Sequence, residues 1–261
     1  MKRSSRARMG AAVAVSALSL ALITGCGGES DGSSDSKNDS KNTESSSSPT
    51  QAAAKALSAA ELEKLLLAEG EVKGYKVTSG DDTLPKSKTE VKTDKAECDP
   101  LAWATAALAP GDTDANASNT VAEDKASTAT AQPEDIADAF NVNMTFVGLS
   151  SYEGDGAEQA MKAVSDGVSA CSGGYGLATG GEDSKVTKVA AVQGSGLGDE
   201  SVAFAEDVDM DGEGKATFHT EVVRKGSTIA TFYTVNFAAL GTGETAEIPA
   251  AVVKAQVAKL K

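Results

Sequence analysis

The sequence predicts a single α+β domain, in which several helices pack against an antiparallel strand meander, behind an N-terminal export segment. Three observations lead to this class. The last third of the chain holds three strand-like segments joined by turn sequences, amphipathic helical patterns lie before and after them, and two cysteines are available for one disulfide within the domain.

The chain begins with a predicted lipoprotein signal peptide over residues 1–25. Four basic residues precede an apolar stretch at 11–23 that is too short to span a bilayer stably, and Ile23-Thr24-Gly25-Cys26 follows at its end. Small residues before the cysteine suit a peptidase site. We therefore predict cleavage before Cys26 and a diacylglyceryl thioether on its sulfur. An ordinary secretory signal with an incidental cysteine is the alternative.

Residues 26–50 are predicted to be the lipidated cysteine and a disordered tether, because residues 27–50 contain no aliphatic or aromatic side chain and cannot bury apolar surface. The folded domain is then expected over residues 51–261. Cleavage removes four basic residues and no acidic one, so the formal net charge falls from −14 to about −18. Phosphate backbones and anionic headgroups repel such a chain. We expect no nucleic-acid partner, and membrane contact only through the lipid.

Order is predicted to begin near Leu57. Ser58 and Glu61 form a capping box that opens a short amphipathic helix, and glycines at 70 and 74 end it. Residues 75–78 alternate as a first strand, and residues 80–82 have a turn composition.

A second helix is predicted from Asp99 to Leu108, with Asp99 as the N-cap and Pro100 at the first helical position. Residues 112–129 are polar and loop-like with weak strand content. Residues 141–146 alternate as a half-buried strand.

The second half of the chain is predicted to hold two more helices around the meander. Apolar residues from Ala160 to Cys171 recur at helical spacing, and a Gly-Gly pair ends that helix. The meander strands are Val202–Val208, Thr217–Arg224 and Thr228–Asn236. A closing helix runs over residues 248–260, with Pro249 in its first turn.

Three cysteines occur in the chain. If Cys26 carries lipid, Cys98 and Cys171 remain as an even pair in an oxidising compartment, and a disulfide is the natural inference. A free thiol pair and a metal site are the alternatives. Soft-metal chemistry lacks partners, since there is no Cys-x-x-Cys motif and only one histidine.

The metal-binding and nucleophile motifs are incomplete. Residues 207–212, Asp207-Val208-Asp209-Met210-Asp211-Gly212, copy the first half of an EF-hand loop, but Phe218 stands where the bidentate glutamate belongs, so a solvated hairpin tip is favoured and calcium binding stays open. The only histidine, His219, lies in a predicted strand. Ser195 sits in Gly194-Ser195-Gly196-Leu197-Gly198, whose spacing departs from the Gly-x-Ser-x-Gly of a nucleophile elbow, and predicted strands follow it instead of a helix. We predict no metal, no cofactor and no catalytic residue.

Carboxylate pairs are the remaining chemical candidates. They are Asp81-Asp82, Asp199-Glu200 and Glu206-Asp207, and any of them could serve acid–base chemistry if a cleft raised one pKa. A chain this acidic produces such pairs by chance. The only tryptophan, Trp103, follows Cys98 on a predicted helix and is expected to plug the core over the disulfide.

Several short motifs resemble one family. They are Leu57-Ser58-Ala59-Ala60-Glu61-Leu62, the helices bearing Cys98 and Cys171, Gly198-Asp199-Glu200-Ser201-Val202 and Val222-Val223-Arg224-Lys225-Gly226. Over residues 57–260 the chain is similar to the extracellular sensor domain of actinobacterial receptor serine/threonine kinases of the PknH type, which also occurs as stand-alone lipoproteins. The resemblance implies a strongly twisted antiparallel sheet, a cleft and ligand sensing without catalysis. Those kinase domains usually carry two disulfides, whereas this chain can form one.

We therefore expect a lipid-anchored protein on the extracytoplasmic face of the cell membrane. Its domain would act as a non-catalytic, sensor-like module that binds a small molecule or an envelope protein. A secreted hydrolase that works through carboxylates and a purely structural envelope protein are the alternatives.

Overall fold

A computed structural model describes residues 55–79, 84–125, 141–209, 214–240 and 245–261. The predicted signal peptide over 1–25, the lipidation site Cys26, the tether over 26–50 and the turn over 80–82 lie outside these ranges. The described residues belong to one unit within Thr50–Lys261. None of their helices combines the length and apolar character needed to cross a membrane.

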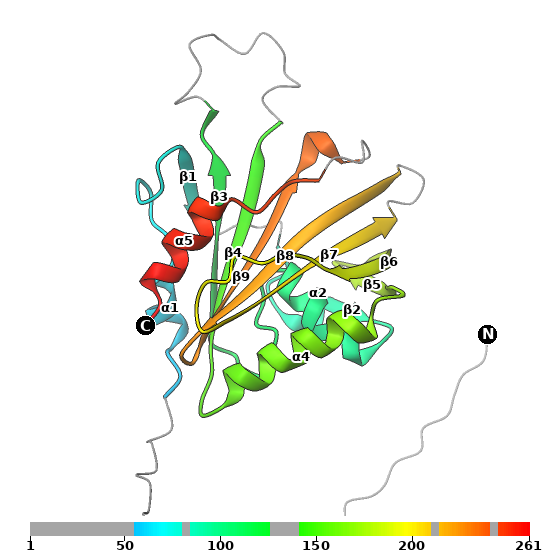
Figure 1. The fold of residues 1–261 in the computed structure, drawn as a ribbon, viewed down its shortest axis with the longest axis horizontal. Coiled ribbons are helices and arrows are strands. Elements are labelled where there is room, and N and C mark those ends of the chain that lie inside the picture. Colours follow the sequence, from blue (N-terminus) through cyan, green and yellow to red (C-terminus); the bar gives the residue numbers. More distant parts are fainter. Residues whose placement is uncertain (1–54, 80–83, 126–140, 210–213, 241–244) are drawn as a thin grey trace, which may run out of the picture. The chain divides into compact units, whose positions relative to one another are not determined.

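The fold is α+β, as predicted, and is built on one nine-stranded antiparallel sheet (Figure 1). The order across the sheet is β1-β3-β4-β9-β8-β7-β6-β5-β2. The strands are β1 Tyr75–Ser79, β2 Val91–Thr93, β3 Asn116–Glu123, β4 Asn143–Ser151, β5 Tyr175–Thr179, β6 Glu182–Ala191, β7 Glu200–Asp209, β8 Lys215–Lys225 and β9 Thr228–Asn236. The helices are α1 Ala59–Glu63, η1 Lys88–Glu90, η2 Ala96–Cys98, α2 Asp99–Thr105, α4 Gly156–Ala170, η4 Phe237–Ala239 and α5 Ala250–Lys259.

The predicted meander is confirmed as β7, β8 and β9, which pair in sequence order. Alternation of side chains sends neighbouring residues to opposite faces, and both faces of the central strands are buried. Val222 belongs to one apolar cluster and Val223 to another. The sheet is therefore covered on both sides.

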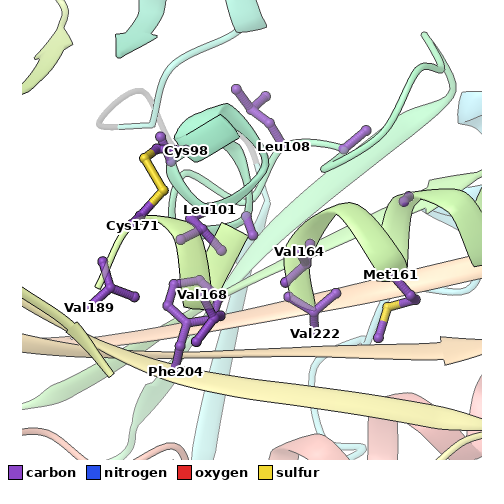
Figure 2. Close-up of a cluster of buried hydrophobic side chains, with 14 of the residues drawn as sticks. Cys98, Leu101, Leu108, Met161, Val164, Val168, Cys171, Val189, Phe204 and Val222 are labelled. Atoms are coloured by element: carbon purple, nitrogen blue, oxygen red, sulfur yellow. A yellow bond between two sulfur atoms is a disulfide. The ribbon is translucent and has the colours of Figure 1, made fainter. Parts of the chain in front are cut away.

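Two pairs of helices cover the two faces. The first cluster joins α2 and α4 to strands β6 to β9 and contains both domain cysteines (Figure 2). The second joins α1 and α5 to β3, β4, β8 and β9. Ser58 and Glu61 form the predicted capping box on α1, with the Ser58 amide donating to the Glu61 carboxylate over 2.8 Å.

Side chains of α5 hold the segment that follows α1. Gln256 is fully buried, its Oε1 accepts from the Leu67 amide over 3.0 Å, and its Nε2 donates to the Leu65 carbonyl over 2.8 Å. The Lys259 ammonium donates to the Leu66 carbonyl over 2.8 Å. These backbone groups lie beyond the end of α1 and have no helical hydrogen-bond partners, so the Gln256 and Lys259 side chains supply the partners instead.

The predicted loop over residues 112–129 is partly wrong, because it contains the eight-residue strand β3 between β1 and β4. This strand buries polar side chains, and Asn119 is satisfied only in part, because its Oδ1 has no hydrogen-bond partner among the described residues. Asn119 is 3% exposed, and its Nδ2 donates to the Leu67 carbonyl over 2.8 Å. Because β3 is rich in polar residues, the sequence pattern did not predict this strand inside the sheet.

Helix α2 is shorter than predicted, and its N-cap is Cys98 rather than Asp99. The helix ends at Thr105, and Ala107 has φ 56°. The Leu108 amide donates to the Trp103 carbonyl over 2.9 Å, which is the backbone pattern of a Schellman ending. Glycine usually occupies the left-handed position, so an alanine there gave no signal.

The chain reaches the described domain at one end of the sheet. The Leu57 amide donates to Ser151 Oγ over 2.9 Å, and Ser151 lies at the end of β4 beside the β8–β9 turn at Ser227. We call this the proximal end. The other end of the same strands, where Asn143 pairs with Asn236, is the distal end (Figure 1).

Candidate functional site

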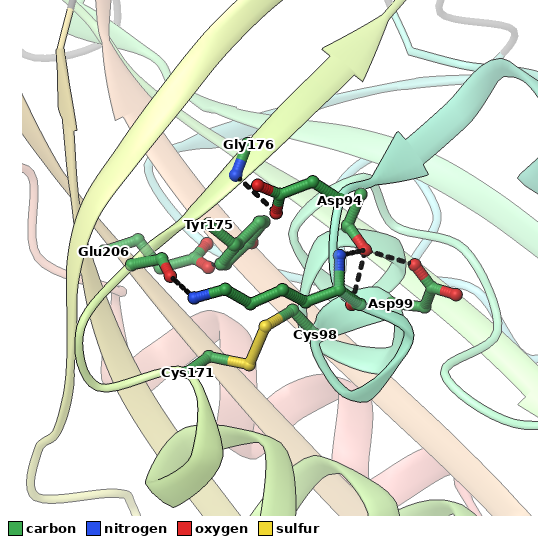
Figure 3. Close-up of a disulfide and its surroundings, with 10 residues drawn as sticks. Asp94, Cys98, Asp99, Cys171, Tyr175, Gly176 and Glu206 are labelled. Carbon is green, nitrogen blue, oxygen red and sulfur yellow. Dashed lines mark hydrogen bonds between the residues drawn. A yellow bond between two sulfur atoms is a disulfide. The ribbon is translucent and has the colours of Figure 1, made fainter.

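The predicted disulfide Cys98–Cys171 is present. It joins the start of α2 to the end of α4, with a Cα–Cα distance of 5.9 Å, and both residues are fully buried (Figure 3). The Lys95 ammonium donates to the Gly174 carbonyl over 2.6 Å nearby. Since solvent does not reach the sulfurs, we assign this bridge a structural role.

A buried carboxyl group lies beside the disulfide (Figure 3). Glu206 on β7 is 2% exposed, its Oε1 accepts from the Tyr175 hydroxyl over 2.6 Å, and its Oε2 accepts from Thr105 Oγ1 over 2.8 Å. Thr105 Oγ1 is 3.0 Å from Thr220 Oγ1. We call these four residues the Glu206 cluster. It ties α2 to β5, β7 and β8.

The environment of this cluster favours a neutral carboxyl group. Burial raises the pKa of Glu206 and outweighs the hydrogen bonds from Tyr175 and Thr105, which act in the opposite direction. Burial and the nearby carboxylate also raise the pKa of Tyr175 and of Tyr233. Within the described ranges, no ion pair includes Glu206. A substrate could not reach this group without rearrangement.

Glu206 and Asp207 do not act together, because successive side chains of a strand point to opposite faces. Asp207 accepts from Thr217 Oγ1 over 2.7 Å, whereas Glu206 faces α2. The Asp81-Asp82 pair lies outside the described residues.

The Asp199-Glu200 pair has a structural partner. Arg224 Nη1 is 3.6 Å from Asp199 Oδ2, and Arg224 Nε is 3.4 Å from Glu200 Oε2. Asp199 Oδ2 also accepts from the Gly226 amide over 2.7 Å. These contacts fix the start of β7 against the β8–β9 turn.

Ser195 and His219 have separate partners. Ser195 Oγ and the Ser195 amide donate to Glu221 Oε1 over 2.5 and 2.7 Å, which pins the loop before β7 across β8. His219 Nδ1 lies 3.7 Å from Glu247 Oε2. No nucleophile–histidine pair therefore arises from these two residues.

The hairpin tip that resembles an EF-hand falls largely outside the described residues, which stop at Asp209 and resume at Gly214. In the part of the chain that is described, no group of three or more His, Cys, Asp or Glu side chains could hold a metal ion.

Trp103 packs partly buried against the α2/α4 cluster. The Lys88 ammonium lies 4.6 Å from the centre of its ring and donates to the Gly111 carbonyl. Burial lowers the pKa of Lys88. Trp103 Nε1 is buried without a hydrogen-bond partner.

A small hollow opens at the distal end. Its cavity volume is about 10 Å³, room for about one water molecule, whereas small-molecule sites usually measure about 300–1,000 Å³. The hollow is lined by Ala216, Thr217, Phe218, Thr234, Val235, Asn236, Leu240 and Ala246. Phe237, 50% exposed, stands beside it on η4, where Asn236 Oδ1 accepts from the Ala238 amide over 3.1 Å. The hollow is too small for a small-molecule ligand, so the exposed Phe237 ring is the feature of this surface that can contact a partner.

No known protein family and no curated protein sequence matches this chain. Solved structures similar to it include the extracellular domain of PknH from Mycobacterium tuberculosis, at 14% identity and a TM-score of 0.44, covering 78% of this chain and 95% of that one. Another is a putative uncharacterized protein, an Rv0999 ortholog, from Mycobacterium smegmatis, at 15% identity and a TM-score of 0.32, covering 77% and 94%.

Proposed function

We propose that this chain is a lipid-anchored protein of the extracytoplasmic face of the cell membrane. Its α+β domain acts as a sensor-like module that binds a small molecule or an envelope protein without turning it over.

The pairing of the cysteines carries this proposal. Cys98 and Cys171 are bonded to each other and fully buried, so Cys26 is the one cysteine left, and it stands directly after Ile23-Thr24-Gly25. A buried disulfide is typical of proteins that fold outside the cytosol. A single remaining thiol at a signal cleavage site supports lipid attachment, and two acyl chains give durable anchoring.

The partners of the acidic residues support a binding role. Arg224 engages Asp199 and Glu200, the Ser195 loop engages Glu221, and Glu206 is enclosed beneath α2. These groups hold the fold together instead of facing a cleft. The distal surface around Phe237 is the surface we assign to a partner, because an exposed aromatic side chain is a common contact point.

Anchoring is tested by detergent partition of the expressed full chain. The parent should enter the detergent phase, and Cys26→Ala should stay in the aqueous phase. Ser30→Ala is the matched control, because it changes a residue close to Cys26 but leaves the anchor and the disulfide, and it should partition like the parent. Equal partition of Cys26→Ala and the parent would refute the anchor.

Binding is tested on the Cys26→Ala chain with envelope glycans and generic ester substrates. A ligand that binds only the native state raises the melting temperature, and a non-catalytic module should show this stabilisation without product. Phe237→Ser should reduce it if the distal surface around Phe237 is the contact. Turnover by the Cys26→Ala chain that is lost in Asp81→Asn/Asp82→Asn would refute the non-catalytic binding role and favour the hydrolase alternative.

A further inference from the structure

We propose that the Glu206 cluster is a pH-dependent latch that holds the C-terminal end of α2 to the sheet and releases it when Glu206 ionises. The latch would make one end of a single helix respond to proton concentration outside the cell. This goes beyond the binding role proposed above and does not depend on lipid attachment.

The position of the cluster on α2 makes release local. Thr105, which donates to Glu206, is the last residue of the seven-residue helix, and the disulfide at Cys98 holds the other end. The chain leaves the helix through the left-handed residue Ala107. If the Glu206–Thr105 contact opened, the last turn of α2 could move while its first turn stayed in place.

The residues across from Glu206 offer no countercharge. Val189 on β6 and Phe218 on β8 pair with Glu206 in the sheet. The titratable side chains that interact with it are themselves acids, Tyr175 on β5 and Tyr233 on β9.

The charged groups of the surrounding elements are directed elsewhere. Asp99 on α2 is acidic and accepts from Thr93 Oγ1 over 2.6 Å. The ammonium groups of Lys95 and Lys88 donate to main-chain carbonyls. The charged side chains of α4 are exposed, whereas its buried residues are apolar or glycine. An ionised Glu206 would therefore be a buried charge with hydroxyl donors and no cation, which is a costly arrangement.

The hydroxyl chain suits the neutral carboxyl group. A protonated Glu206 can donate from Oε2 to Thr105 Oγ1, and Thr105 can then donate to Thr220, because either hydroxyl of that pair can be the donor. Tyr175 continues to donate to Oε1. Both protonation states keep every contact of the cluster, so the missing countercharge is what makes the ionised state costly. Opening at Thr105 would let water reach the ionised carboxylate.

The direction of the pH effect follows from the raised pKa of Glu206. The closed form binds a proton that the open form gives up at neutral pH. The latch is closed below the usual pKa of a glutamate and loosens as pH rises through the raised value. Between the usual and the raised pKa, the opening equilibrium of a one-proton latch increases about tenfold per pH unit, and above the raised pKa it levels off.

Trp103 and the amides of α2 report on the latch directly. Trp103 is the only tryptophan and lies two residues before Thr105. We would follow its emission against pH in the full chain, together with amide exchange of the peptide over residues 101–108. Glu206→Gln keeps the acceptor for Tyr175 and cannot ionise. At the same high pH, this variant should exchange more slowly in that peptide than the parent, and its emission transition should be absent.

Two further variants keep the test decisive. Glu221→Gln is the matched control, since Glu221 is 4% exposed but contacts Ser195 on the opposite face; it should leave the α2 transition unchanged. Thr105→Val removes the contact without removing the carboxyl group and should expose the last turn of α2 at low pH as well. The latch is overturned if the transition survives in Glu206→Gln. It is also overturned if the folded parent shows no faster α2 exchange than Glu206→Gln at any pH up to 9.

Discussion

Removal of the Cys98–Cys171 bridge should cost the domain a large part of its stability. The bridge links residues 73 apart in the sequence. In the chain-entropy treatment, opening a loop of that length frees enough conformational entropy in the unfolded chain to lower the free energy of unfolding by about 4 kcal/mol. For a domain of this size, each kcal/mol corresponds to about 2–4 °C, so the melting temperature should fall by about 8–16 °C.

The assay compares Cys26→Ala with the triple variant that also carries Cys98→Ala and Cys171→Ala. Urea unfolding followed by circular dichroism gives the free energy, and calorimetry gives the melting temperature. The denaturant slope should rise in the variant, because the unfolded chain without the bridge exposes more surface. The Cys26→Ala parent under reducing conditions should approach the variant.

Two results would refute the reasoning. Two alkylatable thiols in native, unreduced Cys26→Ala protein would show that the bridge does not form. A loss below about 1 kcal/mol with the bridge intact in the parent would show that the unfolded chain is not constrained as the entropy treatment requires.

Three further expectations concern packing and charge. Gly148→Ala would place a Cβ against a main-chain oxygen and a threonine hydroxyl, so the free energy of unfolding measured with urea should fall by about 1–3 kcal/mol or more. In Gly173→Ala the new Cβ meets no atom within 4 Å, and the free energy of unfolding should fall less. Equal losses in the two variants would contradict this. Gln256→Leu should lower the free energy of unfolding by about 2–4 kcal/mol, because it leaves an amide and a carbonyl of the segment after α1 without hydrogen-bond partners. Gln159→Leu, at an exposed position of α4, is the control and should change little. An unchanged stability of Gln256→Leu would contradict the role given to these two hydrogen bonds. Burial raises the pKa of Glu206, so the stability that the protonated group gives the folded state is complete below the ordinary glutamate pKa and is lost as pH rises through the raised value. The melting temperature of Glu206→Gln should therefore exceed that of the parent at pH 8 but not at pH 4. A difference in melting temperature that is the same at both pH values would contradict this linkage.

The elements that the sequence predicted well are those with a clear period. Strands β7 to β9 and β4 alternate apolar and polar residues, and α4 carries its apolar stripe up to Cys171. Strands β2, β5 and β6 went unpredicted. They lie together at one edge of the sheet. β2 and β5 are only three and five residues long, β6 begins with charged and polar residues, and their order follows from β6 pairing with β7 and β5 pairing with β6 and β2.

Parts of the candidate site could be predicted from the sequence, and other parts could not. The disulfide followed from counting cysteines. Val202, Phe204, Glu206 and Val208 occupy alternate positions of one strand, so the same period that identified the strand also places Glu206 on its apolar face. Its partners Tyr175 and Thr105 come from elements 31 and 101 residues away, and only the folded chain brings them together.

Mass spectrometry of the mature N-terminus tests the central claim most directly. Protein purified from membranes of the expressing cell should yield an N-terminal peptide that begins at Cys26, carries a diacylglyceryl group on the cysteine sulfur, and lacks residues 1–25. An N-terminus at any other residue, or a Cys26 thiol free of lipid in membrane-bound protein, would contradict the account.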